Sequence, residues 1–385
     1  MIEQPIGRKA PKAGWRHRAI LLLCVVAAAG LLYGSVTCVR PASFKAVKSP
    51  REGRVMNDRV AVVYSARYQV ELGGAEKLHS FDIRKYAKIY LALNTAGLIR
   101  PEDVFVPDAA DSESLLLVHT AGYVESLKDS KAVAGYLEAP LVAALPAGLV
   151  ESQILQPFRF ATGGTIFASR LALEHGIGIN LGGGYHHAKP DAGGGFCIYN
   201  DLAVAVRVLQ RDGLIRRALI VDLDVHQGNG TAVCFAGDPD VFTFSMHQGD
   251  IYPVPKETSD LDVELPEGTD DAAYLEVLRK HWPAVLDRAR PDIILLQAGC
   301  DTLRSDPLAR LAMTKEGIVA RDACIVDEAV RRGMPVVVTL GGGYSPEAWD
   351  VQFASVRRTI ETYGLAPGSG RTPRPPTAKE KLYTK

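Results

Sequence analysis

The sequence predicts an α/β protein in which a single-domain parallel β-sheet is flanked by helices. Short apolar runs alternate along the chain with longer amphipathic stretches, which is the pattern of a parallel sheet buried on both faces. Several of these runs end directly in polar and ionisable residues, at the point where open α/β sheets bind ligands. The composition, 47% hydrophobic and 23% charged, is typical of a globular protein.

The expected elements begin with a strand at 60–64 and a helix capped by Asp82 that runs to Asn94 and ends at Gly97. Residues 114–127 fit either a strand or a helix, followed by a helix. The later elements, in order, are helix 162–175, strand 178–181, helix 200–212, strands 218–221 and 241–246, helix 270–290, strand 292–298, helix 314–332 and strand 335–340.

Charge and cysteine content exclude some classes of protein. Lys plus Arg equals Asp plus Glu at 44 each, so no overall positive field indicates nucleic-acid binding. Six cysteines without CxxC spacing indicate neither a disulfide framework nor a cysteine zinc site.

The N-terminal part divides into a basic leader (1–18), an uncharged apolar segment (19–39) and a linker (40–57). At about 1.5 Å per residue the apolar segment is long enough to cross a bilayer, which predicts a single-pass membrane anchor of undetermined orientation. A cleaved signal segment is the alternative, and a start at Met56 would leave a cytoplasmic protein. The main folded domain is expected at 58–365, and the proline-rich tail 366–385 is expected to be disordered.

A row of donor side chains follows the strand at 218–221. Asp222, Asp224 and His226 alternate and so share one face of the chain. With Asp301, which ends a later strand, Asp224 and His226 form a set of two carboxylates and an imidazole that suits zinc or ferrous iron. The alternative is that one aspartate caps a helix and the histidine is an ordinary buried group.

Two further motifs follow strands. His186 and His187 could move a proton, and Tyr344, on a glycine run, could donate its hydroxyl to an oxyanion. Taken singly, the histidines could be one metal ligand and one core residue, and the glycine run a simple turn. Together with the aspartates they indicate a metal-dependent hydrolase.

These residues resemble the histone deacetylase family of the arginase-deacetylase fold. The motifs are GGGYHH at 182–187, GGGFCIYND at 193–201, DLDVHQGNG at 222–230, AGCD at 298–301 and GGGY at 341–344. Other segments are similar to the class IV branch, namely EKLHSFD at 76–82, TGGTIFAS at 162–169, GTDDAAYLEVL at 268–278 and EGIVARD at 316–322.

The resemblance implies a role for each matching residue. Asp224, His226 and Asp301 would bind the catalytic Zn²⁺. The other implied roles are general base and acid for His187, charge stabilisation for His186 paired with Asp222, carbonyl polarisation for Tyr344, and an acyl-lysine tunnel for Gly195, Phe196 and Tyr252. A structural K⁺ near Asp222, Asp224 and Ser245 is implied as well.

Two positions depart from class I of the family. Asn229 stands where an aspartate would orient His187, so the pKa of that histidine should be raised less. Ala121 stands where an aspartate grips the substrate backbone, which suggests that binding depends more on the acyl chain.

The predicted function is zinc-dependent hydrolysis of acetyl or long fatty-acyl groups from the ε-amine of lysine in a protein or peptide. The alternatives are hydrolysis of small N-acetylated amines such as acetylpolyamines, for which Asp250, Glu257 and Asp260 would supply acidic groups near Tyr252, and a non-catalytic acyl-lysine-binding membrane protein. No direct nucleic-acid binding is expected.

Overall fold

The computed structural model describes residues 59–368. The predicted leader, membrane segment, linker and most of the tail therefore lie outside the described residues. One sheet of parallel strands has the order β2-β1-β3-β8-β7-β4-β5-β6, which confirms the predicted parallel sheet. Its strands are β1 (Arg59–Val63), β2 (Val104–Phe105), β3 (Gly176–Asn180), β4 (Ala218–Asp222), β5 (Val241–Gln248), β6 (Leu261–Leu265), β7 (Ile293–Gln297) and β8 (Val336–Thr339).

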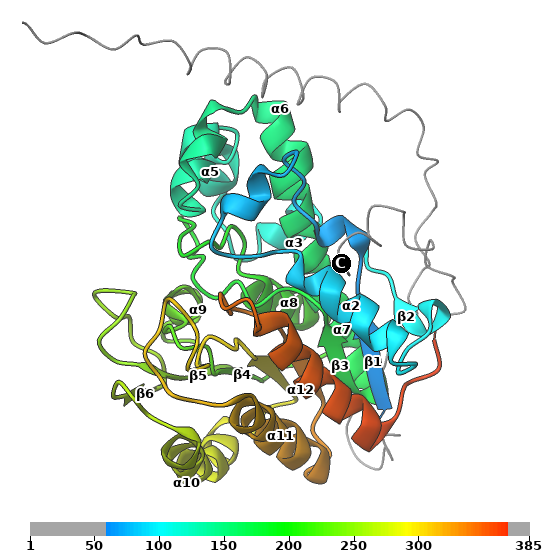
Figure 1. The fold of residues 1–385 in the computed structure, drawn as a ribbon. Coiled ribbons are helices and arrows are strands. Elements are labelled where there is room, and N and C mark those ends of the chain that lie inside the picture. The colour runs from blue at the N-terminus through cyan, green and yellow to red at the C-terminus, as the bar shows by residue number, and fades with distance from the viewer. Residues whose placement is uncertain (1–58, 369–385) are drawn as a thin grey trace, which may run out of the picture.

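Helices cover both faces of this sheet (Figure 1). The helices of the described residues are α2 (Lys85–Thr95), α3 (Ser112–Leu115), α4 (Ala121–Ser126), α5 (Ser130–Tyr136), α6 (Ala147–Val150), α7 (Gln156–His175), α8 (Asp201–Arg211), α9 (Asn229–Cys234), α10 (Asp271–Ala289), α11 (Lys315–Arg331) and α12 (Ala348–Tyr363). Single turns complete the chain: η1 (Ala66–Tyr68), η2 (Ala75–Leu78), η3 (Pro101–Asp103), η4 (Pro140–Ala144) and η5 (Glu151–Leu155). Among residues 59–368, no helix combines the length and the apolar character that crossing a bilayer requires.

Strands β1, β3, β4, β7 and β8 are mostly apolar because both of their faces are buried. In β1, Val60 and Val62 contribute to the core beneath α2, α10, α11 and α12, whereas Ala61 and Val63 contribute to the core beneath α7 and α8. This alternation follows from the two-residue period of a strand. The resulting two-sided burial fixes the register of the central strands and therefore the place where each of them ends.

Most predicted elements are present, with differences at their ends. Helices α8 and α11 begin within one residue of the expected positions and are capped there: the side chain of Asn200 accepts from the amide of Ala203, and that of Thr314 from the amide of Gly317. The predicted cap at Asp82 is wrong, because its carboxylate binds Arg84 at 2.5 Å and α2 begins after it. Helix α7 starts at residue 156 rather than 162, and β2, β6 and α12 were not predicted.

Candidate active site

The strands that end in ionisable residues are neighbours in the sheet. Strands β3, β8, β7 and β4 are adjacent in that order. His186 and His187 follow β3, Tyr344 follows β8, Asp301 follows β7 and Asp222 ends β4. The carboxyl ends of parallel strands share one edge, so these residues gather in one place, as ligand sites in open α/β sheets do.

Asp224, His226 and Asp301 form a candidate metal centre. One donor atom from each lies within 4.8 Å of the others, and all three side chains are buried. The Nδ1 atom of His226 is 3.2 Å from a carboxylate oxygen of each aspartate. Burial and the charge of Asp224 raise the pKa of Asp301 to about 7, because two carboxylates are held together away from water.

The surroundings of these donors also suit a bound ion. The side-chain amide of Gln297 and the backbone amide of Gly342 donate to Oδ2 of Asp224 at 2.8 and 2.9 Å and so fix its orientation. A Cβ atom at Gly342 would lie 2.2 Å from Oδ2 of Asp301, so only glycine leaves this space free. Two carboxylates, one imidazole and a cleared space fit a divalent cation such as zinc.

His186 is held as a cation. Its Nδ1 lies 2.7 Å from Oδ2 of Asp222. Burial opposes the charge, but the carboxylates of Asp222 and Asp224 outweigh burial and raise the pKa of His186 to about 9. This side chain is therefore protonated at neutral pH.

His187 is held as a neutral base. Its Nδ1 lies 2.7 Å from Oδ1 of Asn229, and because an amide oxygen only accepts, the proton is on Nδ1 and Nε2 is free. Burial lowers the pKa of His187 well below 6.5, and the neighbouring charges of His186 and His226 lower it further. The His186 and His187 rings are only 4.0 Å apart, so the structure places a cation beside a base.

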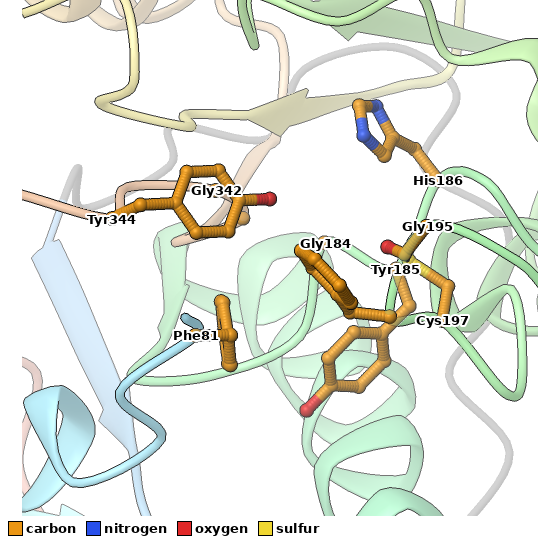
Figure 2. Close-up of a pocket in the computed structure, with 10 residues that line it drawn as sticks. Phe81, Gly184, Tyr185, His186, Gly195, Cys197, Gly342 and Tyr344 are labelled. Atoms are coloured by element: carbon orange, nitrogen blue, oxygen red, sulfur yellow. The ribbon is translucent and has the colours of Figure 1, made fainter. Parts of the chain in front are cut away.

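Tyr344 faces His186 across the candidate pocket (Figure 2), which has about 280 Å³ of empty space including its opening to solvent. Burial raises the pKa of Tyr344 well above 10, and the charges of Asp224 and Asp301 act in the same direction. The hydroxyl therefore keeps its proton and can donate it in a hydrogen bond. The Tyr344 ring lies 6.1 Å from the ring of His226.

Gly195 and Phe196 line the pocket and Tyr252 lies next to His187, while their role in an acyl-lysine tunnel stays a prediction. The Tyr252 ring is 4.9 Å from His187 and 43% exposed, and the Phe196 ring is 5.8 Å from Tyr344. A Cβ atom at Gly195 would be 2.3 Å from the His187 ring, so glycine is needed for this close approach. The entrance is lined by aromatic rings, which suits an unbranched apolar chain.

Several residues that support the site were missed from the sequence. The carboxylate of Asp306 accepts the amide of Tyr344 at 2.8 Å, and Nζ of the buried Lys85 donates to the carbonyls of Gly341 and Gly342. Gln297 also belongs to this group. The one feature of the sequence that could have pointed to any of these residues is that Asp306 lies close to Asp301 along the chain.

Of the residues expected near a structural potassium ion, the structure brings Asp222 and Ser245 side by side. Asp222 and Ser245 are paired residues on β4 and β5, and the Ser245 hydroxyl lies 2.9 Å from Nδ1 of His247. Potassium binding here remains a prediction from the resemblance.

Comparison with known proteins decides the family. The family model described as histone deacetylase domain matches residues 79–360. This chain belongs to the histone deacetylase family. It is 36% identical over 289 residues to Histone deacetylase 2 of Arabidopsis thaliana, covering 74% of this chain and 75% of that protein. It is 30% identical over 338 residues to Acetoin utilization protein AcuC of Bacillus subtilis, covering 81% of this chain and 84% of that protein.

Two solved structures share the fold of this chain. The crystal structure of the HDA15 HD domain matches with a TM-score of 0.63 at 24% identity, over 79% of this chain and 90% of that chain. The acetylpolyamine aminohydrolase from Burkholderia pseudomallei matches with a TM-score of 0.62 at 20% identity, over 79% and 98%. The chain is thus a histone deacetylase-family hydrolase with the arginase-deacetylase fold.

Proposed function

We propose that this histone deacetylase-family member is a zinc-dependent lysine deacylase. The observation that carries the proposal is the gathering of His187 and Tyr344 around the donors Asp224, His226 and Asp301. The rings of His187 and Tyr344 lie 5.9 and 6.1 Å from the ring of His226. Zinc bound to those donors would polarise the acyl carbonyl and lower the pKa of water from about 15.7 toward about 7.

His187 would transfer the protons of the reaction, and Tyr344 and His186 would stabilise the negative charge that forms on the carbonyl oxygen. Nε2 of His187 accepts the proton of the attacking water, and the Tyr344 hydroxyl donates a hydrogen bond to the oxyanion. The His186 cation, 4.0 Å from the His187 ring, stabilises the same negative charge. Protonated His187 gives its proton to the ε-nitrogen as the C–N bond breaks, which releases a carboxylate and the lysine amine. Asn229 holds Nδ1 throughout.

The charges at the entrance favour acyl-lysine over small polyamines. Glu257 is paired with Lys189 at 2.6 Å, and Asp260 accepts from the amide and hydroxyl of Thr243. Asp250 and Asp260 are both exposed, and the carboxylate of Asp250 accepts a hydrogen bond from Gln248. A site for a polycation would need unpaired carboxylates there, so acetylpolyamine hydrolysis is the second candidate.

The acyl group is proposed to supply much of the binding energy. Ala121 opens α4 with an exposed methyl group that cannot accept a hydrogen bond from a peptide backbone. Long fatty-acyl groups are therefore proposed substrates beside acetyl. The class IV relationship and single-pass membrane attachment through residues 19–39 are part of the same proposal and rest on the sequence.

A substrate comparison tests this function. The full chain, purified in detergent and loaded with zinc, is given one peptide carrying acetyl-lysine or myristoyl-lysine, and separately an N-acetylated diamine. Asp301→Ala serves as the blank. The proposal expects peptide hydrolysis that the blank lacks, with myristoyl released faster than acetyl. Faster turnover of the diamine would favour the small-amine function. Peptide binding without any hydrolysis would indicate an acyl-lysine-binding protein.

A further inference from the structure

Arg321 on α11 is the largest of the fully buried side chains in the described part of the chain. A guanidinium is charged at every physiological pH, so its burial is costly unless each N–H group finds a partner. Its position in the core next to the candidate metal centre therefore calls for an explanation.

One nitrogen of this guanidinium joins the two loops that carry the metal donors. Nη1 donates to the carbonyl oxygen of Leu223 at 2.9 Å and to the hydroxyl of Thr302 at 3.1 Å. Leu223 lies immediately before Asp224, and Thr302 immediately follows Asp301. The guanidinium thus ties the end of β4 to the end of β7.

The guanidinium is itself held from the side away from the metal centre. Its Nε donates to Oδ1 of Asp322 at 2.9 Å, and Oδ2 of Asp322 accepts from the Ser355 hydroxyl of α12 at 2.6 Å. A planar fork anchored at one end presents the other end in a fixed direction. Lysine, with a single flexible ammonium group, could not make the same set of bonds.

We infer that Arg321 is a positioning residue for the metal centre: it sets the separation of Asp224 and Asp301 through Leu223 and Thr302. The inference rests on the proposed function only in that the site binds a metal. Partners that orient metal ligands typically contribute about 10–100-fold to metal affinity or activity, and the same range is expected here.

Measuring zinc affinity distinguishes a role of Arg321 in positioning the metal donors from a role in the overall stability of the fold. Arg321→Lys in the full chain keeps the charge beside Asp322 but loses the fork, and Thr302→Val removes only the hydroxyl acceptor. Ile325→Ala is the control, because Ile325 is a fully buried core residue of the same helix and its aliphatic side chain cannot form a hydrogen bond to either loop. Zinc affinity is measured by competition with a chromophoric chelator, the Co²⁺ protein by its visible absorption, and stability by thermal unfolding.

The expected result is zinc binding about 10–100-fold weaker in Arg321→Lys and an altered Co²⁺ spectrum, with a smaller change in Thr302→Val. Ile325→Ala should unfold at a lower temperature with unchanged zinc affinity. Wild-type affinity and an unchanged Co²⁺ spectrum in folded Arg321→Lys would overturn the inference, and if that variant does not fold, the same result in Thr302→Val would overturn it. Failure of the wild-type chain to bind zinc would instead refute the proposed function together with the inference.

Discussion

Gly342→Ala introduces one methyl group into the candidate metal centre. Glycine at this position does not have a positive φ, so alanine is compatible with the backbone and only space is at issue. The new Cβ atom would lie 2.2 Å from Oδ2 of Asp301 and 2.5 Å from Oδ2 of Asp224. Two of the three donor side chains are therefore displaced by a single substitution.

The size of the effect follows from these distances. Ordinary van der Waals contact begins at 3.4 Å, so the Asp301 oxygen must move by about 1.2 Å. Metal–ligand distances vary by only about 0.2 Å, and a displacement of about 1 Å can cost about 100-fold in rate. We therefore expect kcat/KM to fall at least about 100-fold, or about 2.7 kcal/mol, with weaker zinc binding.

The assay is hydrolysis of an acyl-lysine peptide at matched zinc concentrations, together with chelator competition. Gly135→Ala on α5 is the matched control, because a Cβ atom there would meet nothing within 4 Å. Its activity should equal that of the wild type. Gly342→Ala protein that binds zinc and turns over as well as the control would refute the placement of the metal between these carboxylates.

Three other substitutions test the proton transfers and the tyrosine. Asn229→Asp should raise the pKa of His187 by about 1–3 units, because a carboxylate favours the imidazolium; the acidic limb of the kcat/KM–pH profile then moves upward and turnover at neutral pH falls. An unmoved limb would show that His187 is not the base. Tyr344→Phe should lower kcat about 10²–10³-fold with little change in thermal stability, and near-normal kcat would remove its oxyanion role. Asp306→Asn should lower kcat about 10-fold, since a charged hydrogen bond to the Tyr344 amide contributes about 1.5 kcal/mol or more. In Tyr344→Phe protein, adding Asp306→Asn should not lower kcat any further. Additive losses in kcat would show that Asp306 does not act by positioning the Tyr344 hydroxyl.

The central sheet was predictable because its strands are short apolar runs bounded by glycine or polar residues. Strands β3, β4, β7 and β8 all follow this pattern. Their shared carboxyl edge explains why residues far apart along the chain could be placed together before the fold was known. Strand β2 has only two residues, and the burial of β6 is mostly partial, so neither has a strong apolar signal.

The supporting side chains were not predictable because their roles depend on packing between elements. Lys85 and Arg321 lie on helices, where lysine and arginine usually face solvent, yet both are buried beneath the site. Gln297 ends β7 and turns toward Asp224. The local sequence does not reveal which groups these side chains contact, because their partners come from other strands and loops.

A zinc titration tests the central claim most directly. The full chain, stripped by a chelator and kept in detergent, is titrated with zinc while hydrolysis of an acyl-lysine peptide is followed, in parallel with His187→Ala protein. We predict that wild-type activity rises to a plateau at one zinc per chain and that His187→Ala binds the same zinc with almost no turnover. Hydrolysis by the metal-free chain, or normal turnover by His187→Ala, would contradict the account.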